Sequence, residues 1–288
     1  MSLHNELTPE SESRVVPQIL VRETKCTTLL HRMTYGSRTE YTANLYKGCT
    51  HGCTYCYALS LVHDERKWGS YVDAKVNAPQ TLERELMGLK KDVVFLSSAS
   101  DPYQPVEAKY GITRGCLEVL ERHDFPVTIL TRSPLVLRDL DIIKRLRWVK
   151  VGISVTTVPV RKLEPGVPSL QRRIETLRKL GQAGVRTWVS FAPVIPGLMM
   201  VDLDKVFEEF GRVGVSEVSF GVLRFSGYEA SREMFEKSAG VGFAEALAGR
   251  EDTVKKLSDL VRKHGMEHND AADWKDEPGE TTLDTYCR

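Results

Sequence analysis

Three cysteines lie close together in the sequence, and thiolates are strong ligands for metals. Cys49, Cys53 and Cys56 form the pattern C-x3-C-x2-C within eight residues. Zinc and iron–sulfur clusters are the centres that such thiolates commonly bind. Crowding of this kind, in a chain whose other cysteines are scattered, indicates a metal site rather than disulfides.

The number of cysteines in this group has a chemical consequence. A [4Fe-4S] cluster has four irons, so three thiolates leave one iron without a protein ligand. The amino and carboxylate groups of S-adenosylmethionine (SAM) can chelate that iron. Electron transfer from the cluster then cleaves the S–C5′ bond of SAM and releases a 5′-deoxyadenosyl radical. We therefore interpret Cys49, Cys53 and Cys56 as ligands of a cluster that binds SAM.

Other interpretations of the three cysteines stay open at this point. Structural zinc usually takes four nitrogen or sulfur ligands. His51 could complete such a set, although a residue between two ligands in so tight a loop has poor geometry. A ferredoxin-type electron carrier would show a fourth cysteine nearby, and the next one along the chain is Cys116. The three thiols could also be unrelated buried side chains.

The remaining cysteines carry weaker signals. Cys116 lies on the apolar side of a predicted helix, which is typical of a buried thiol. Cys287 is the penultimate residue of an acidic tail, and its simplest interpretation is an inert chain end. If that tail folds back over the active site, Cys287 comes near the radical, which makes it the one candidate for a catalytic side chain. Cys26 has no ligand partner in the sequence.

Alternating strands and helices must position the cysteines. From Tyr41 onward, apolar runs alternate with helical patterns, which is typical of βαβ units and a parallel sheet. Six such units suit a closed or three-quarter barrel as well as a doubly wound sheet. The predicted strands are Tyr41–Lys47, Asp92–Ser98, Pro126–Thr131, Val149–Thr156, Val185–Phe191 and Ser216–Val222. The predicted helices are Pro79–Leu89, Thr113–Arg122, Leu135–Leu146, Ser169–Ala183 and Asp202–Phe210, with Ser169 and Asp202 as N-caps.

This pattern divides the chain into three regions. Residues 1–40 lack sustained periodicity and are interpreted as an N-terminal extension. Residues 41–227 form the predicted barrel, and the three cysteines lie in the loop just after its first strand. Residues 228–288 are interpreted as two further helices, within residues 228–265, followed by a polar tail.

The net charge of +1 hides an uneven distribution. Residues 267–288 carry seven acidic and two basic side chains, and residues 1–12 carry three acidic and no basic ones. The two ends therefore sum to −8, and the residues between them carry +9. A basic body suits a phosphate-bearing or nucleic-acid partner. Lysines and arginines that merely solvate helix surfaces would give the same balance.

The sequence offers no signal for a membrane or for export. No apolar run approaches the roughly 18 residues that span a bilayer. The first residues are polar and acidic, unlike a secretory signal or a transit peptide. We therefore expect a cytoplasmic protein with no membrane partner, in a compartment where thiols are kept reduced.

The segment around the cysteines resembles the radical SAM superfamily, and Tyr41–Leu140 resembles its spore photoproduct lyase-like branch. The matching segments are Lys47–Ala58 (KGCTHGCTYCYA), Ser98–Pro105 (SASDPYQP), Leu130–Ser133 (LTRS) and Arg138–Leu140 (RDL). The resemblance implies an α/β fold, a partial (β/α)6 TIM-like barrel. Cluster and SAM would lie at the carboxyl ends of the strands, where barrel folds place active sites.

The resemblance also implies contacts to SAM. Tyr55 matches an aromatic residue that packs near the adenine, and Ser100 matches a serine at the methionine end of SAM. Arg132 occupies the place of a lysine that meets the SAM carboxylate, which a guanidinium can bind through two hydrogen bonds. Ser154 matches a serine on the fourth strand near the same ligand. Further candidate contacts are Ser98, Asp101, Thr156 and Ala192.

The turn that begins at Asp101 has two interpretations. Pro102 and Pro105 make the turn rigid and orient Asp101, Tyr103 and Gln104. We favour a wall of the SAM or substrate pocket. The alternative is a turn that enters a helix, with Asp101 as its capping residue.

The resemblance fails at one chemically important position. Photoproduct lyases return a hydrogen atom to the product radical from a cysteine at the end of the second strand, and alignment on Asp101 places Ser98 there. An O–H bond is far stronger than an S–H bond, so serine cannot give up a hydrogen atom in this way. The C-terminal tyrosines of those lyases are not recognisable either. Photoproduct repair would therefore need Cys287 or Cys116 to supply the thiol.

We therefore expect a radical SAM enzyme of the lyase or transferase class that abstracts hydrogen from an unidentified substrate. The basic body makes nucleic acid the first substrate class to test. The cluster would need an external one-electron reductant, such as a flavodoxin or ferredoxin. A metal-stabilised nucleic-acid-binding protein without catalysis and an electron-transfer protein without SAM affinity are the rival hypotheses.

Overall fold

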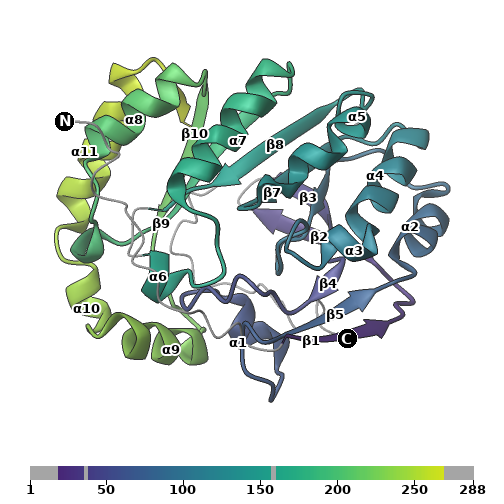
Figure 1. Ribbon diagram of the computed structural model, residues 1–288, viewed down its shortest axis with the longest axis horizontal. Helices are drawn as coiled ribbons and strands as arrows, with labels where there is room; N and C mark the ends of the chain where they lie inside the picture. Colours follow the sequence, from purple (N-terminus) through teal and green to yellow (C-terminus); the bar gives the residue numbers. More distant parts are fainter. Residues whose placement is uncertain (1–18, 36–37, 157–159, 269–288) are drawn as a thin grey trace.

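The computed structural model describes residues 19–35, 38–156 and 160–268, and its main element is a curved sheet (Figure 1). The sheet has eight strands in the order β11-β10-β9-β8-β7-β6-β3-β2. Neighbouring strands from β3 to β10 all run parallel. These six strands are β3 (Arg38–Ala43), β6 (Val94–Leu96), β7 (Val127–Thr131), β8 (Val149–Ser154), β9 (Thr187–Val194) and β10 (Glu217–Val222). The sheet does not close, so the architecture is a partial TIM-like barrel, as predicted.

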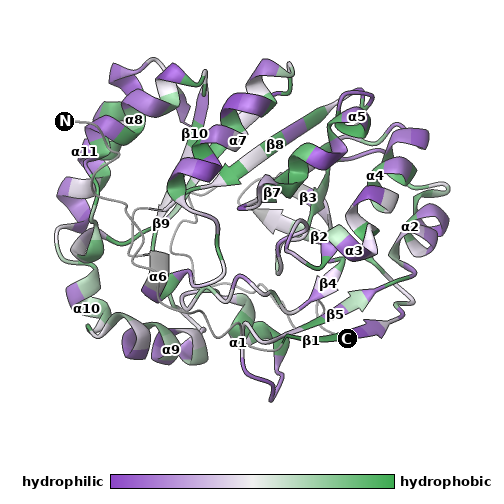
Figure 2. Ribbon diagram, viewed as in Figure 1, coloured by the Kyte–Doolittle hydropathy of each residue, from purple (hydrophilic) through white to green (hydrophobic). Residues whose placement is uncertain are grey.

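Helices cover the outer face of this sheet (Figure 1). Ser169 and Asp202 are the N-caps of α7 and α8 as predicted, since their side chains accept hydrogen bonds from the backbone N–H of Arg172 and Asp204. In Figure 2 α2, α7 and α11 combine hydrophilic and hydrophobic residues, as amphipathic helices that cover a sheet must. The outer helices are α2 (Ala78–Leu86), α4 (Ile112–Arg122), the 3-10 helix η2 (Pro134–Asp139) with α5 (Leu140–Ile143), α7 (Leu170–Gln182) and α8 (Leu203–Arg212).

The first predicted strand is wrong in one respect, because the segment forms two strands. Strand β3 ends at Ala43, and the chain then leaves the barrel. After this bend β4 (Tyr46–Lys47) pairs antiparallel with β5 (Tyr71–Lys75). Together with β1 (Leu20–Thr24) they form a separate sheet, in the order β1-β5-β4. The cysteine loop thus starts from this small sheet and not from the barrel itself.

Two strands lie in the segment where the sequence shows no sustained periodicity. Strand β1 pairs parallel with β5, and β2 (Leu30–Tyr35) pairs antiparallel with β3. Both lie at the edge of a sheet. The residues of β1 are exposed or half-buried, so the alternation of apolar and polar residues that reveals a strand is absent.

The C-terminal region has one helix more than predicted. It contains α9 (Glu229–Ala239), α10 (Phe243–Ala246) and α11 (Arg250–Lys263), followed by β11 (Glu267–His268) beside β10. Three short helices lie elsewhere: α1 (Ala58–Val62), α3 (Glu107–Tyr110) and α6 (Val160–Leu163), with the 3-10 turn η3 (Pro196–Leu198). Over the described ranges no helix is long and apolar enough to cross a bilayer.

The hydrophobic core has one large part and two small ones. The large cluster fills the space between the sheet and the outer helices. One small cluster joins Cys53 and Tyr55 to Phe225 and Phe235, and the other contains Cys49 with Trp68 and the hydrophobic helix α1 (Figure 2). The cysteine loop is therefore packed on both sides.

Candidate active site

The three cysteines lie on the loop between β4 and α1, and their side chains are turned inward. Cys49 and Cys53 are buried and Cys56 is half-buried. Burial raises the pKa of Cys53 well above its usual range and raises that of Cys56 to about 11. A buried thiolate needs a compensating cation, and a metal can replace the proton.

The spacing of the cysteines bears on which metal they suit. Among the residues that the structure describes, no three His, Cys, Asp or Glu side chains are close enough to hold one metal ion. All ligands of a zinc ion must converge on one point at about 2.0–2.3 Å. The thiolates of a [4Fe-4S] cluster bind different irons at separate corners. A cluster therefore does not require the three thiols to converge on one point, as a zinc ion does.

The backbone of the cysteine loop is held from three directions. The side chain of Gln104 accepts a hydrogen bond from the N–H of Thr50 at 2.9 Å and donates one to the carbonyl of Gly48 at 3.2 Å. The indole of Trp68 donates to the carbonyl of Cys53 at 3.2 Å. The hydroxyl of Ser231, on α9, donates to the carbonyl of Cys56 at 2.8 Å. Loop position is therefore fixed by residues far apart in the sequence.

His51 makes a buried contact with Asp101. Its Nδ1 lies 3.3 Å from Oδ2 of Asp101, and both side chains are buried. Burial alone would lower the pKa of His51, but the Asp101 carboxylate and Cys49 raise it to about 10. This contact joins the cysteine loop to the turn after β6.

Asp101 acts as an anchor between two strand ends. Its carboxylate accepts hydrogen bonds from the hydroxyl of Thr131 at 2.6 Å, from the N–H of Arg132 at 2.8 Å and from the N–H of Tyr103 at 2.9 Å. These contacts join the turn after β6 to the end of β7. The carboxylate thus anchors the end of β7, and contact of Asp101 with a ligand stays a prediction.

Arg132 follows β7 and reaches toward a buried carboxylate. Its Nε lies 3.6 Å from Oε1 of Glu164, and its side chain is 21% exposed. Glu164 is fully buried, with Oε1 accepting from the hydroxyl of Tyr55 and Oε2 accepting from Arg173 at 3.0 Å. Burial would raise the pKa of Glu164, but the cations of Arg173 and Arg132 lower it.

Glu164 and Arg173 were not predicted from the sequence. A lone acidic residue in a turn has no periodic signal, but the turn sequence Glu164-Pro165-Gly166 is itself a recognisable feature. A Cβ atom on Gly166 would lie 2.3 Å from the carbonyl oxygen of Thr50, so only glycine lets this turn touch the cysteine loop. The N–H of Gly166 also donates to the carbonyl of His51 at 3.0 Å.

The structure brings several predicted residues together around Glu164. Tyr55 and Arg132 contact it directly, and Thr156 lies buried beside it. Ser154 is buried at the end of β8, and its carbonyl accepts a hydrogen bond from Arg173 at 3.0 Å.

Two other predicted residues lie elsewhere. Ser98 follows β6, with its hydroxyl 3.2 Å from Oγ1 of Thr42 and 3.3 Å from Nδ2 of Asn44. Ala192 is half-buried on β9. Cys287 lies outside the described residues.

Polar atoms that lack partners show whether SAM would fit here. The hydroxyl of Ser100 is buried and forms no hydrogen bond with any described residue, and Nε of Arg132 has only its ion pair with Glu164 at 3.6 Å. Buried polar groups are nearly always bonded, so such an exception leaves room for a ligand or an ordered water. The carboxylate and amino groups of the methionine part of SAM offer matching acceptors and donors. The residues present therefore fit this cofactor.

Sequence comparison identifies the class to which this fold and site belong. Residues 43–210, more than half of the chain, match the family described as the radical SAM superfamily. The chain belongs to this superfamily of enzymes, whose members use a [4Fe-4S] cluster and SAM and depend on an external reductant.

Two relatives extend the comparison. An uncharacterized protein of Methanocaldococcus jannaschii is 32% identical over 199 residues, which are 67% of this chain and 73% of that protein. A radical SAM Nalpha-GlyT isomerase of Pseudomonas phage M6 is 29% identical over 196 residues. This match covers 66% of the chain but only 40% of the isomerase.

Solved structures support the fold. Spore photoproduct lyase, complexed with a dinucleoside spore photoproduct, superposes with a TM-score of 0.64. The superposition covers 86% of this chain and 81% of the lyase, at 17% sequence identity.

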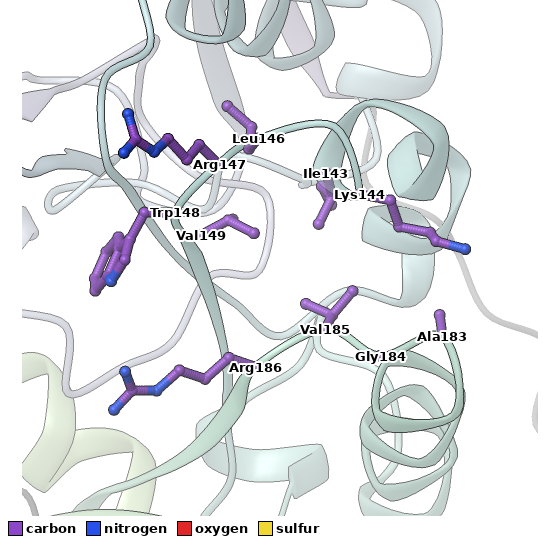
Figure 3. A pocket seen from close by; sticks show the side chains of 10 residues that line it. All are labelled: Ile143, Lys144, Leu146, Arg147, Trp148, Val149, Ala183, Gly184, Val185 and Arg186. Carbon is purple, nitrogen blue, oxygen red and sulfur yellow. The ribbon is translucent and has the colours of Figure 1, made fainter.

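A surface hollow of about 370 Å³ lies away from this site (Figure 3). Its residues lie where β8 and β9 begin, including Val149 and Arg186, whereas the site lies where the strands end. Apolar side chains such as those of Val149 and Ile143 line it between Arg147 and Lys144. Arg147 and Arg186 are already close to the carboxylates of Asp124 and Glu217. The hollow is therefore separate from the candidate active site.

Proposed function

We propose that Cys49, Cys53 and Cys56 hold a [4Fe-4S] cluster, and that Arg132 and Ser100 hold the methionine part of SAM against it. With both groups bound, the site supplies a 5′-deoxyadenosyl radical that removes a hydrogen atom from the substrate. The observation that best supports this is the burial of Cys49 and Cys53 together with the unbonded hydroxyl of Ser100 and the guanidinium of Arg132, whose charge acts on Cys53.

The chain's own residues bind and orient SAM, and they exclude water from the site. The guanidinium of Arg132 presents donors to the SAM carboxylate. The ring of Tyr55, 6% exposed, packs between the loop and the C-terminal helices, where it can meet the adenine. Ser154, Thr156 and Ala192 lie on or just after β8 and β9, and we propose that they line the same pocket. The small apolar clusters around the loop keep water from the cluster.

We propose nucleic acid as the first substrate class to test, and a flavodoxin or ferredoxin as the reductant. Two observations support nucleic acid: the charge of +9 between the acidic chain ends, and a structural neighbour solved with a dinucleoside photoproduct. Photoproduct repair by the same route has less support. Ser98 cannot donate a hydrogen atom, and Cys116 is buried in the main core on α4.

Isotope transfer tests the substrate class. Deuterated oligonucleotides, peptides and small metabolites are each incubated anaerobically with the reconstituted enzyme, SAM and dithionite. We expect deuterium in 5′-deoxyadenosine from the oligonucleotides, because a hydrogen atom moves from substrate carbon to C5′. Transfer from peptides or metabolites alone would reject nucleic acid, and the Cys53→Ala variant controls for background exchange.

A further inference from the structure

The carboxylate of Glu164 joins four segments of the chain at one buried point. It contacts Tyr55 of the cysteine loop, Arg132 at the end of β7 and Arg173 of α7, with Thr156 alongside at the end of β8. Its side chain is 0% exposed, as is that of Arg173. A carboxylate is costly to bury unless it is paired and hydrogen-bonded, and here both oxygens are engaged.

The two oxygens of Glu164 face different parts of the molecule. Oε2 faces Arg173, whose other nitrogen donates to the carbonyl of Ser154 at 3.0 Å. The contact of Oε2 thus fixes the turn Glu164-Pro165-Gly166 to the barrel. Oε1 faces both the hydroxyl of Tyr55 and Nε of Arg132. This half lies between the loop that carries the cysteines and the cation at the end of β7.

We propose that Glu164 is a positioning residue that couples the cysteine loop to Arg132, so that the SAM-binding guanidinium keeps a fixed place relative to the cluster. The inference rests on the proposed function of Arg132. A guanidinium binds a carboxylate through two hydrogen bonds only in one orientation. Oε1 attracts the Nε edge of Arg132 and leaves the opposite edge for a ligand. The cations of Arg173 and Arg132 also keep Glu164 ionised, since they lower its pKa.

A purely structural role makes a different prediction. If Glu164 only neutralises Arg173, its loss would lower the stability of the fold, but folded protein would bind SAM as before. If Glu164 positions Arg132, its loss would weaken SAM binding in protein that is folded and holds its full cluster. SAM affinity at equal cluster content therefore separates the two roles.

The test is the Glu164→Gln variant, which keeps size and one acceptor but removes the charge. Cluster content is measured as iron and sulfide, SAM affinity by anaerobic calorimetry, and the cluster environment by the change that SAM causes in the EPR spectrum of the reduced cluster. We expect full cluster content, a Kd for SAM that is roughly tenfold higher and a smaller EPR change. The matched control is Glu175→Gln on α7, whose carboxylate pairs with Arg178 and Lys179 at the surface and should leave all three readouts unchanged.

An unchanged SAM affinity in cluster-loaded Glu164→Gln would overturn the inference. If that variant does not fold, Tyr55→Phe replaces it, because it keeps the ring and removes only the hydroxyl that joins the loop to Oε1. We expect weaker SAM binding there too, and wild-type affinity would again overturn the coupling. Absence of SAM binding in the wild-type protein would instead reject the proposed function on which the inference rests.

Discussion

At the scale of single residues, candidate ligands can be predicted from the sequence more readily than the residues that support them. The spacing of Cys49, Cys53 and Cys56 is local, so it can be seen in one short segment. Glu164 and Arg173 act through contacts that only folding creates, and Arg173 looks like any helix-surface arginine until its 0% exposure is known. Asp101 was predicted as a pocket wall, and the structure shows that its carboxylate anchors the end of β7; its contact with SAM or substrate stays a prediction.

Arg132→Ala tests the proposed contact with the SAM carboxylate. The variant loses a charge-assisted pair, so the Kd for SAM should rise by at least about tenfold while iron and sulfide content stay at the wild-type level. Anaerobic calorimetry on the reconstituted protein measures the affinity. Arg178→Ala, on the exposed side of α7, is the matched control. Wild-type affinity in the Arg132 variant would remove this residue from the site.

At the scale of elements, periodicity predicted the parallel strands and the outer helices but not the strands at the edges of the two sheets. Strands β6 to β10 lie where their apolar runs predicted them, because the strands of a parallel sheet are covered on both faces and are rich in apolar residues. Strand β1 has no such face. The split between β3 and β4 depends on pairing with β5, which is a tertiary contact that a single segment cannot show.

Helix α9 has a role at the cysteine loop, although it lies outside the residues matched by the family. Ser231→Ala removes the hydrogen bond to the carbonyl of Cys56, which then keeps the N–H of Leu59 as a donor. We expect the free energy of unfolding to fall by about 0.5–1.5 kcal/mol and the cluster to be lost faster during exposure to a chelator. Urea unfolding and the rate of iron release measure these effects.

The matched control for this variant is Ser258→Ala on α11, where the hydroxyl bonds only to the carbonyl of Val254 in its own helix. It should change neither the stability nor the rate of iron release by a comparable amount. Equal effects of the two substitutions would show that α9 does not hold the loop.

At the scale of the whole molecule, the fold was predictable and the substrate was not. The partial barrel follows from the order of its elements and from a resemblance carried by short motifs. The reacting group of a substrate leaves no such pattern, because it depends on the shape of a pocket built from many segments. The division of the chain into an extension, a barrel and a C-terminal region stays a prediction, as does the cytoplasmic location.

The free energy of unfolding should depend on pH because of the buried ion pairs of Glu164. The pKa of Glu164 is lower in the folded chain than its ordinary value of 4.5, so its contribution is complete above about pH 4.5 and is lost as the pH falls below it. Each unit of difference between folded and unfolded pKa is worth about 1.4 kcal/mol. Urea unfolding of the metal-free protein from about pH 6 to about pH 3 measures the slope. The slope should be smaller in Glu164→Gln, and identical profiles would contradict this account.

The most direct test is to reconstitute the protein anaerobically with iron and sulfide and then add SAM and dithionite. We predict that the protein binds four irons per chain, as expected for a [4Fe-4S] cluster. We also predict that this protein converts SAM to 5′-deoxyadenosine. Cys53→Ala should lose both the cluster and this activity, whereas Cys26→Ala should keep both. A protein that takes up only zinc, or that holds a cluster but leaves SAM intact, would contradict the account.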